Sequence, residues 1–130
     1  MEEARKKVKR LRQKGENSEV ILTELLHSCG MSFANNGLHY LRESVTFILS
    51  FPVADQRKLR LIKDIYPHVA SMFNTTPTSV ERCIRSSIEV TCLNGNLDFI
   101  HDLLGSTLSV KSGKVTSREM IFTLVDLMQQ

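Results

Sequence analysis

The sequence lacks a long apolar run, a secretory signal and a paired-cysteine motif. Its apolar stretches fall well short of the roughly 18 residues that a membrane-spanning helix requires. The basic N-terminus is not followed by the apolar segment and cleavage site of a signal peptide. These absences argue against a membrane-spanning protein and predict a cytoplasmic one.

Cysteine is scarce, with three residues and no CxxC spacing, so neither a disulfide framework nor a zinc site is indicated. We expect Cys29, Cys83 and Cys92 to be small apolar core residues. The four histidines also lack ligand spacing. No nucleophile–base pair, glycine-rich phosphate loop or metal cluster is visible, so no enzyme, metal or cofactor is predicted.

Positive charge is unevenly distributed along the chain. The net charge is only +3, but the first 14 residues carry seven basic side chains. Gly15 and Asn17 then end the pattern. We interpret residues 1–17 as a basic arm, either a frayed helix or a flexible linker. A solvated tail, a phosphate-contacting arm and an interdomain linker all remain open as its role.

The remaining residues, 18–130, predict one all-α domain: a compact bundle of about six to seven helices that includes a helix-turn-helix. Apolar residues recur with a period near 3.6, and no segment alternates as a strand would. At 130 residues with 42% apolar content, the chain suits a single core. The expected helices are 18–29, 37–50, 55–66, 67–73, 78–93, 96–104 and 117–128, with a loop at 109–115.

Capping residues and prolines set the expected helix boundaries. Ser18 is a plausible N-cap, and Thr116 with Glu119 forms a capping box. The helix after Asn74 has two possible caps: Thr76 with Pro77 at the first position, or Thr78 with Glu81. Proline is not tolerated inside a helix, so Pro67 predicts a break and a new helix.

The segment from Pro67 to Leu93 has the spacing of a helix-turn-helix: a short helix, a turn of about four residues and a longer helix. Ala70 is small, as the first helix requires where two helices cross closely. The second helix has an inward-facing set of residues at helical spacing. These are Val80, Ile84, Ser87, Ile88 and Thr91.

The opposite face of that helix is polar and carries two arginines one turn apart. A guanidinium group can bond O6 and N7 of guanine, and a carboxylate such as Glu81 can accept from cytosine N4. An amphipathic surface helix also has a charged outer face without any ligand, and this alternative stays open. The candidate DNA-binding residues are Thr76, Thr78, Ser79, Glu81, Arg82, Arg85 and Ser86.

Three segments carry a family resemblance: Gly37–Glu43, Tyr66–Thr76 and above all Ser79–Val90, which reads SVERCIRSSIEV. Residues from about Val20 to Met128 resemble the C-terminal effector domain of the master response regulator of sporulation initiation, the stage zero sporulation protein A family. The resemblance implies an all-α transcription-factor domain that binds double-stranded DNA, associated with the nucleoid.

The same resemblance implies partners. Glu81, Arg82 and Arg85 match the family's DNA-facing positions. The stretch Gly95–Leu108, with Asn96, Phe99 and Leu104, matches the segment that contacts the sigma subunit of RNA polymerase. The last helix, Ser117–Met128, matches the region where neighbouring domains pair on DNA as a homodimer on tandem sites.

The chain also departs from the family pattern. Ser79 replaces a usual basic residue and Ser86 a usual histidine, which changes the groove-facing arc. Phe99 and Leu104 are also unusual in the sigma-facing segment. The family's receiver domain has no counterpart here, so we expect a fragment or a stand-alone paralogue.

Two functions follow from the sequence. The first is sequence-specific reading of duplex DNA by the helix-turn-helix. The second is a helical protein-interaction module, an adaptor or antagonist that kept the fold and lost operator reading. In that second case Phe99, Leu103 and Leu104 would contribute to an exposed apolar docking patch.

Overall fold

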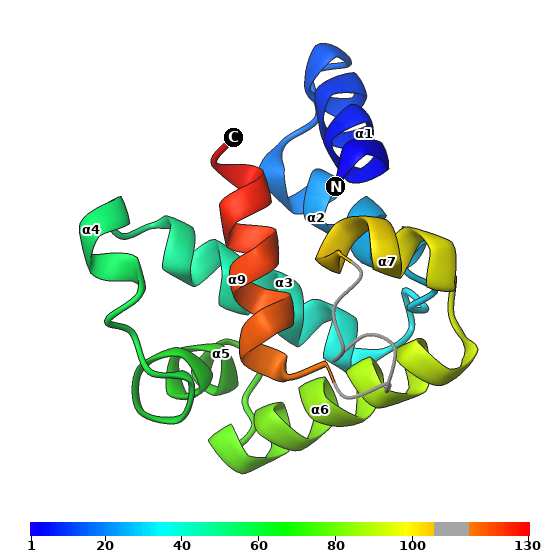
Figure 1. Ribbon diagram of the computed structural model, residues 1–130. Coiled ribbons are helices and arrows are strands. Elements are labelled where there is room, and N and C mark those ends of the chain that lie inside the picture. The colour runs from blue at the N-terminus through cyan, green and yellow to red at the C-terminus, as the bar shows by residue number, and fades with distance from the viewer. Residues whose placement is uncertain (106–114) are drawn as a thin grey trace.

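The computed structural model describes residues 1–105 and 115–130, and these residues form eight α-helices, one π-helix and no strand (Figure 1). The expected all-α class is therefore confirmed. The loop expected at 109–115 lies outside the described residues except for Val115. The elements are α1 (Glu2–Gln13), α2 (Ser18–Ser28), α3 (Asn36–Leu49), α4 (Val53–Gln56), η1 (Leu61–Ile65), α5 (Tyr66–Met72), α6 (Pro77–Asn94), α7 (Leu97–Leu104) and α9 (Ser117–Met128).

Helix α3 lies at the centre of the bundle and packs against α2, α5, α6 and α9 (Figure 1). Its apolar residues Leu38, Leu41, Val45 and Ile48 are fully buried. Their spacing of three and four residues places them along one side of the helix. Burying each such side chain contributes about 1.5–3 kcal/mol, so α3 supplies much of the core. Helix α6 packs on α3, which therefore fixes the orientation of α6.

Helix α1 is a complete helix rather than the frayed or flexible arm expected for residues 1–17. Ala4 and Val8 are buried and Leu11 is half-buried, so one face of α1 packs on α2 and α7. The three apolar residues are spaced at i, i+4 and i+7, which places them on one side of the helix. The prediction of an arm was based on the many charged residues of the segment and did not take this apolar spacing into account.

Asp102 of α7 caps the start of α1. Its Oδ1 accepts from the Glu3 backbone N–H at 3.0 Å, and its Oδ2 accepts from the Ala4 N–H at 2.8 Å. Burial alone would raise the pKa of Asp102, but these donors and the nearby amino terminus outweigh it and lower the pKa below 3.8. A carboxylate from another helix thus satisfies two of the free N–H groups at the start of α1.

The prediction of one helix over residues 55–66 is wrong. The structure has the short α4, a turn, and then the π-helix η1, which continues directly into α5. Ile62 is 68% exposed, whereas Ile65 and Tyr66 are buried and Leu59 is half-buried. The apolar spacing could not reveal where the helix widens.

The new helix expected at Pro67 is present, because α5 has Pro67 in its first turn. The expected break before it is absent, since η1 continues directly into α5. The preceding turn is widened: the Ile65 N–H donates to the Arg60 carbonyl and the Tyr66 N–H to the Leu61 carbonyl. Proline has no N–H to donate and its ring crowds the preceding turn of an ordinary α-helix. A π-type turn accommodates it without ending the helix.

The structure confirms the cap predicted for α9 and decides between the two possible caps of α6. Thr76 caps α6 and Thr116 caps α9, each accepting a backbone N–H three residues later. Asn96 does the same for α7, and Gly105 ends that helix with a φ of 79°. The exception is α2, where Asn17 rather than Ser18 is the N-cap and accepts from the Val20 N–H.

The helices of residues 1–105 and 115–130 include none with the length and apolar character needed to cross a membrane.

Candidate nucleic-acid interface

Helices α5 and α6 form the expected helix-turn-helix and pack directly on each other. Asn74 in the turn has a φ of 53°, in the left-handed region that asparagine tolerates better than most residues. The Thr75 N–H donates to the Ala70 carbonyl at 3.0 Å, which closes the turn. Ala70 is buried, as expected for a residue at a helix crossing.

The inner face of α6 is buried as predicted. The five expected positions are all buried, and they lie against the rest of the bundle. Only one side of a helix can pack in this way, so the other side is left for solvent or a ligand. The buried residues are Val80, Ile84, Ser87, Ile88 and Thr91.

Helix α6 lies along one edge of the molecule (Figure 1). Most of the candidate DNA-binding residues are exposed on it. Thr76, Thr78, Arg82, Arg85 and Ser86 are exposed. Two other candidates, Ser79 and Glu81, are half-buried. The hydroxyl oxygen of Thr76 accepts the Ser79 N–H at 3.1 Å, so it caps the helix in addition to any contact with a ligand.

The two arginines of α6 have different surroundings. Arg85 is paired with Glu81 one turn earlier on the same helix. Arg82 makes no hydrogen bond or ion pair with any residue that the structure describes. Its guanidinium group therefore has all five N–H donors available.

Arg82 and Ser86 border a groove of about 480 Å³ between α6 and the start of α3. Asn35 and Asn36 form its other side, and Cys83, Ser87 and Val90 complete the lining. Helix α3 begins here, so the positive end of its dipole faces the same groove as Arg82. The surroundings of Arg82 are thus polar and favour an anionic ligand.

Asn35, Gly37 and Ser87 form a close contact between α3 and α6. The side-chain oxygen of Asn35 accepts from the Gly37 N–H at 2.8 Å and from the Ser87 hydroxyl at 2.9 Å. A Cβ atom on Gly37 would lie only 1.8 Å from the Ser87 Oγ, so no larger residue fits. This contact sets how closely α6 approaches α3.

Asn35 lies between the expected helices 18–29 and 37–50, and neither it nor Gly37 was predicted as a site residue. The sequence did contain a signal: an asparagine directly before a helical apolar pattern is a common N-cap. The requirement for glycine was not visible, because it depends on Ser87, which is 50 residues further along the chain.

The predicted partner segment on α7 is only partly accessible. The side-chain oxygen of Asn96 caps α7, while Phe99 and Leu104 are half-buried against the core. Leu103 is fully buried and so does not belong to an exposed patch as expected. The exposed apolar residues near this segment are Val90, Leu93 and Leu97.

Helix α9 buries its apolar side and keeps a polar face. Phe122 is covered by two guanidinium groups, those of Arg57 and Arg118, each 4.5 Å from the ring centroid. Arg57 also pairs with Asp126 at 2.7 Å. Any contact of this helix with a second copy would therefore involve charged groups.

The basic residues of α1 do not lie beside the candidate interface. Figure 1 places α1 and α6 at opposite ends of the molecule, with α3 and α9 between them. Because charges more than about 10 Å apart are largely screened at 0.1 M salt, the α1 charges act separately from those of α6.

Cys29 and Cys92 are buried, Cys83 is half-buried, and all three thiols are free. Burial, with a contribution from Cys92, raises the pKa of the Cys29 thiol to about 12, so this group is unreactive at neutral pH. Within residues 1–105 and 115–130, no three His, Cys, Asp or Glu side chains gather as metal ligands would.

A comparison with protein-family models gives a match over residues 22–128 to the family described as "Sporulation initiation factor Spo0A C terminal". The match includes α3, α5, α6, α7 and α9 in full. Helix α1 lies outside it.

Proposed function

The chain belongs to the family of sporulation initiation factor Spo0A C-terminal domains, which bind DNA and regulate transcription, and on this basis we propose that it reads a specific duplex sequence with α6. Helix α6 enters the major groove with its N-terminal half. Arg82 contacts a base edge, and Arg85 contacts a base or a phosphate. Thr76, Thr78, Ser79, Glu81 and Ser86 complete the contact surface.

The observation that carries this proposal is the asymmetry of α6. One side is buried in the bundle, and the other presents Arg82, which has no partner among residues 1–105 and 115–130, near the start of the helix. In DNA-binding helix-turn-helix units the residues near the start of the second helix contact base edges. The family match supplies the general function, and this face supplies the residues.

Selection of binding sites from a random duplex library at about 0.15 M salt tests the proposal. We expect one enriched motif that the protein prefers over scrambled DNA by at least tenfold, or about 1.4 kcal/mol. Salt-sensitive binding without enrichment would contradict sequence reading, because phosphate contacts alone supply that behaviour.

Two protein contacts are part of the proposal. The first joins the α7 segment, with Asn96, Phe99 and Leu104, to the sigma subunit of RNA polymerase. The second pairs two copies on tandem sites through the polar face of α9. Substitution of Asp126 by Arg reverses a charge on that face, and we expect it to abolish cooperative binding to a tandem site while binding to a single site is retained.

A second candidate function is a protein-interaction module without operator reading. It is favoured by Ser79 and Ser86, which leave the groove-facing arc with two short neutral side chains. The exposed Val90, Leu93 and Leu97 offer an apolar contact surface beside α7. Two results together would favour this second function. The library selection would enrich no motif, and the protein would bind purified sigma subunit with an affinity that Leu93→Asp lowers.

A further inference from the structure

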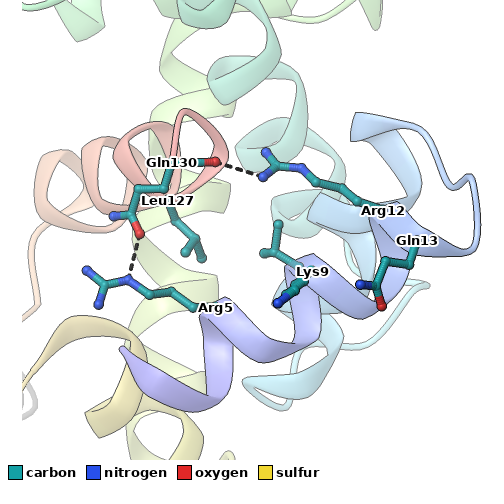
Figure 2. A pocket seen from close by; sticks show the side chains of 7 residues that line it. Arg5, Lys9, Arg12, Gln13, Leu127 and Gln130 are labelled. Atoms are coloured by element: carbon teal, nitrogen blue, oxygen red, sulfur yellow. Dashed lines mark hydrogen bonds between the residues drawn. The ribbon is translucent and has the colours of Figure 1, made fainter.

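A groove between α1 and the end of α9 lies away from the candidate DNA interface, and it carries an inference independent of DNA binding. It encloses about 440 Å³, within the range of ligand-binding pockets. Figure 2 shows Arg5 and Arg12 reaching from α1 to Gln130 on either side of Lys9. The lining residues are Arg5, Val8, Lys9, Arg12, Gln13, Leu127 and Gln130.

Polar contacts across the two ends of the groove hold it open. Arg12 donates to the backbone oxygen atoms of Met128 at 2.6 Å and Gln130 at 2.8 Å, at and just after the end of α9. The Arg5 Nε donates to the Gln130 side-chain oxygen at 2.6 Å. These contacts fix the position of α1 relative to α9, so the groove is already formed without a ligand.

The chemistry of the groove is apolar at its base and cationic at its rim. Val8 and Leu127 line the groove and are buried, so they form its base. The methylene stems of Arg5, Lys9 and Arg12 form the walls. No acidic residue is among the lining residues. Lys9 makes no ion pair or hydrogen bond with the described residues, and the Nη atoms of Arg5 are also without a partner there.

These features favour one class of ligand. An apolar side chain inserted between the methylene stems would be surrounded by positive charge. Carboxylates next to it on the ligand would then pair with Lys9 and Arg5. A DNA backbone offers phosphates but no apolar group to fill the groove. We propose that the groove binds an acidic segment of a partner protein, anchored by one large apolar side chain.

Helix α1 lies outside residues 22–128, the part that the family model matches, yet it builds half of this groove. The partner site is therefore a feature that α1 adds to the effector domain. Since α6 lies at the opposite end of the molecule, the same chain can bind DNA and the acidic segment at once (Figure 1).

The test uses a fluorescein-labelled 14-residue peptide of glutamates with leucines at positions 5 and 9, measured by fluorescence anisotropy with the whole chain. We expect it to bind and to shift the amide NMR signals of Val8, Lys9 and Leu127. A second peptide with both leucines replaced by serine should bind at least tenfold more weakly, since it lacks the anchor.

Two variants separate charge from shape. Lys9→Glu reverses the charge at the rim, and Gln13→Trp fills the groove without changing the charge. Both residues are exposed, so neither substitution disturbs the core. We expect each to weaken binding of the leucine peptide at least tenfold. Lys63→Glu, the same charge reversal at an exposed position on η1, is the matched control and should leave binding within twofold.

Three results would overturn the proposal. If Lys9→Glu and Lys63→Glu weaken peptide binding equally, the peptide is attracted by the net charge of the protein alone. Equal binding of the leucine and serine peptides would mean that no anchor enters the groove. The third result is that the peptide does not bind at 1 mM while Lys9→Glu lowers the affinity for a non-specific duplex. That result would indicate that this face binds nucleic acid instead. The random-library selection, repeated with the same protein variants, measures DNA reading by α6 separately from peptide binding.

Discussion

Arg82 and Arg85 are one turn apart on α6, but among the residues that the structure describes only Arg85 has a partner. The Glu81 carboxylate holds Arg85, with the two side chains 31% and 55% exposed. A surface pair of this kind contributes little to stability, yet it limits the directions in which Arg85 can point. Arg82 has no such restraint. If α6 reads DNA as proposed, we therefore expect Arg82 to contribute more to base reading than Arg85.

The first prediction concerns Arg82→Ala. We expect a cost of about 1–3 kcal/mol on the selected operator and a much smaller cost on random DNA, because a bidentate base contact is lost. Binding titrations on both duplexes at one salt concentration measure the difference. Arg10→Ala removes the same charge from α1 and should change neither affinity. An equal loss on both duplexes in Arg82→Ala would show that Arg82 contacts phosphate only.

A second prediction concerns Gly37→Ala. In an ordinary helix this change stabilises by about 0.5–1 kcal/mol, because glycine has the greater backbone freedom to lose. Here the added Cβ would lie 1.8 Å from the Ser87 Oγ and 2.7 Å from the Cys83 carbonyl oxygen. We expect a net loss of about 1–3 kcal/mol, typical of overpacking. Urea denaturation measures it, and unchanged or higher stability would contradict the close contact.

The same variant tests the position of α6. If Gly37 sets the distance between α3 and α6, the operator affinity of Gly37→Ala should fall even at temperatures where the protein remains folded. Loss of stability with full retention of operator affinity would limit Gly37 to a role in packing.

At the scale of elements, α1 is attached to the bundle by contacts at its two ends. Asp102 holds its first turn and Arg12 joins its last turn to the end of α9. Between them only Ala4 and Val8 are buried. A helix with so few buried residues depends strongly on its caps, since its free N–H groups otherwise face competing water.

A third prediction follows for Asp102→Ala. Loss of an N-capping acceptor costs about 0.5–2 kcal/mol, and we expect this loss to appear locally in α1. Hydrogen exchange of the α1 amides should become faster than in the unmodified protein, while exchange in α3 stays unchanged. Asp98→Ala, an exposed aspartate on the same helix, is the control. Equal exchange of α1 in both variants would contradict the capping role.

At the scale of the whole molecule, buried ionisable groups link stability to pH. Burial raises the pKa of the Tyr66 hydroxyl to about 12 and that of the Cys29 thiol to about 12, from ordinary values of 10.0 and 9.0. In both residues the folded state favours the protonated form. The unfolded state therefore releases its protons at a lower pH, and unfolding becomes easier as the pH rises.

The fourth prediction is alkaline destabilisation. For Tyr66 the stability is complete below pH 10 and decreases between pH 10 and about 12, by about 2–3 kcal/mol for a shift of two pKa units. Denaturant midpoints measured from pH 8 to pH 11.5 should show this fall. Tyr66→Phe should make it shallower, and Tyr40→Phe controls for loss of a tyrosine hydroxyl as such. An unchanged profile in Tyr66→Phe would exclude Tyr66 as a contributor.

The sequence by itself determined the helix-turn-helix and the orientation of α6. Its periodicity separated the buried Val80 and Ile84 from the exposed Arg82, and the caps at Thr76, Asn96 and Thr116 were visible as local patterns. Such features depend on neighbours within a few residues, so they can be recognised along the chain.

Only the tertiary structure decided the rest. Helix α1 is ordered because Asp102, about 100 residues away, caps it, and Gly37 must be glycine because Ser87 packs against it. The π-helix before Pro67 and the groove at Lys9 likewise arise from how segments meet. A sequence pattern records which residues are apolar or charged, but a contact between distant segments has no local pattern from which it can be read.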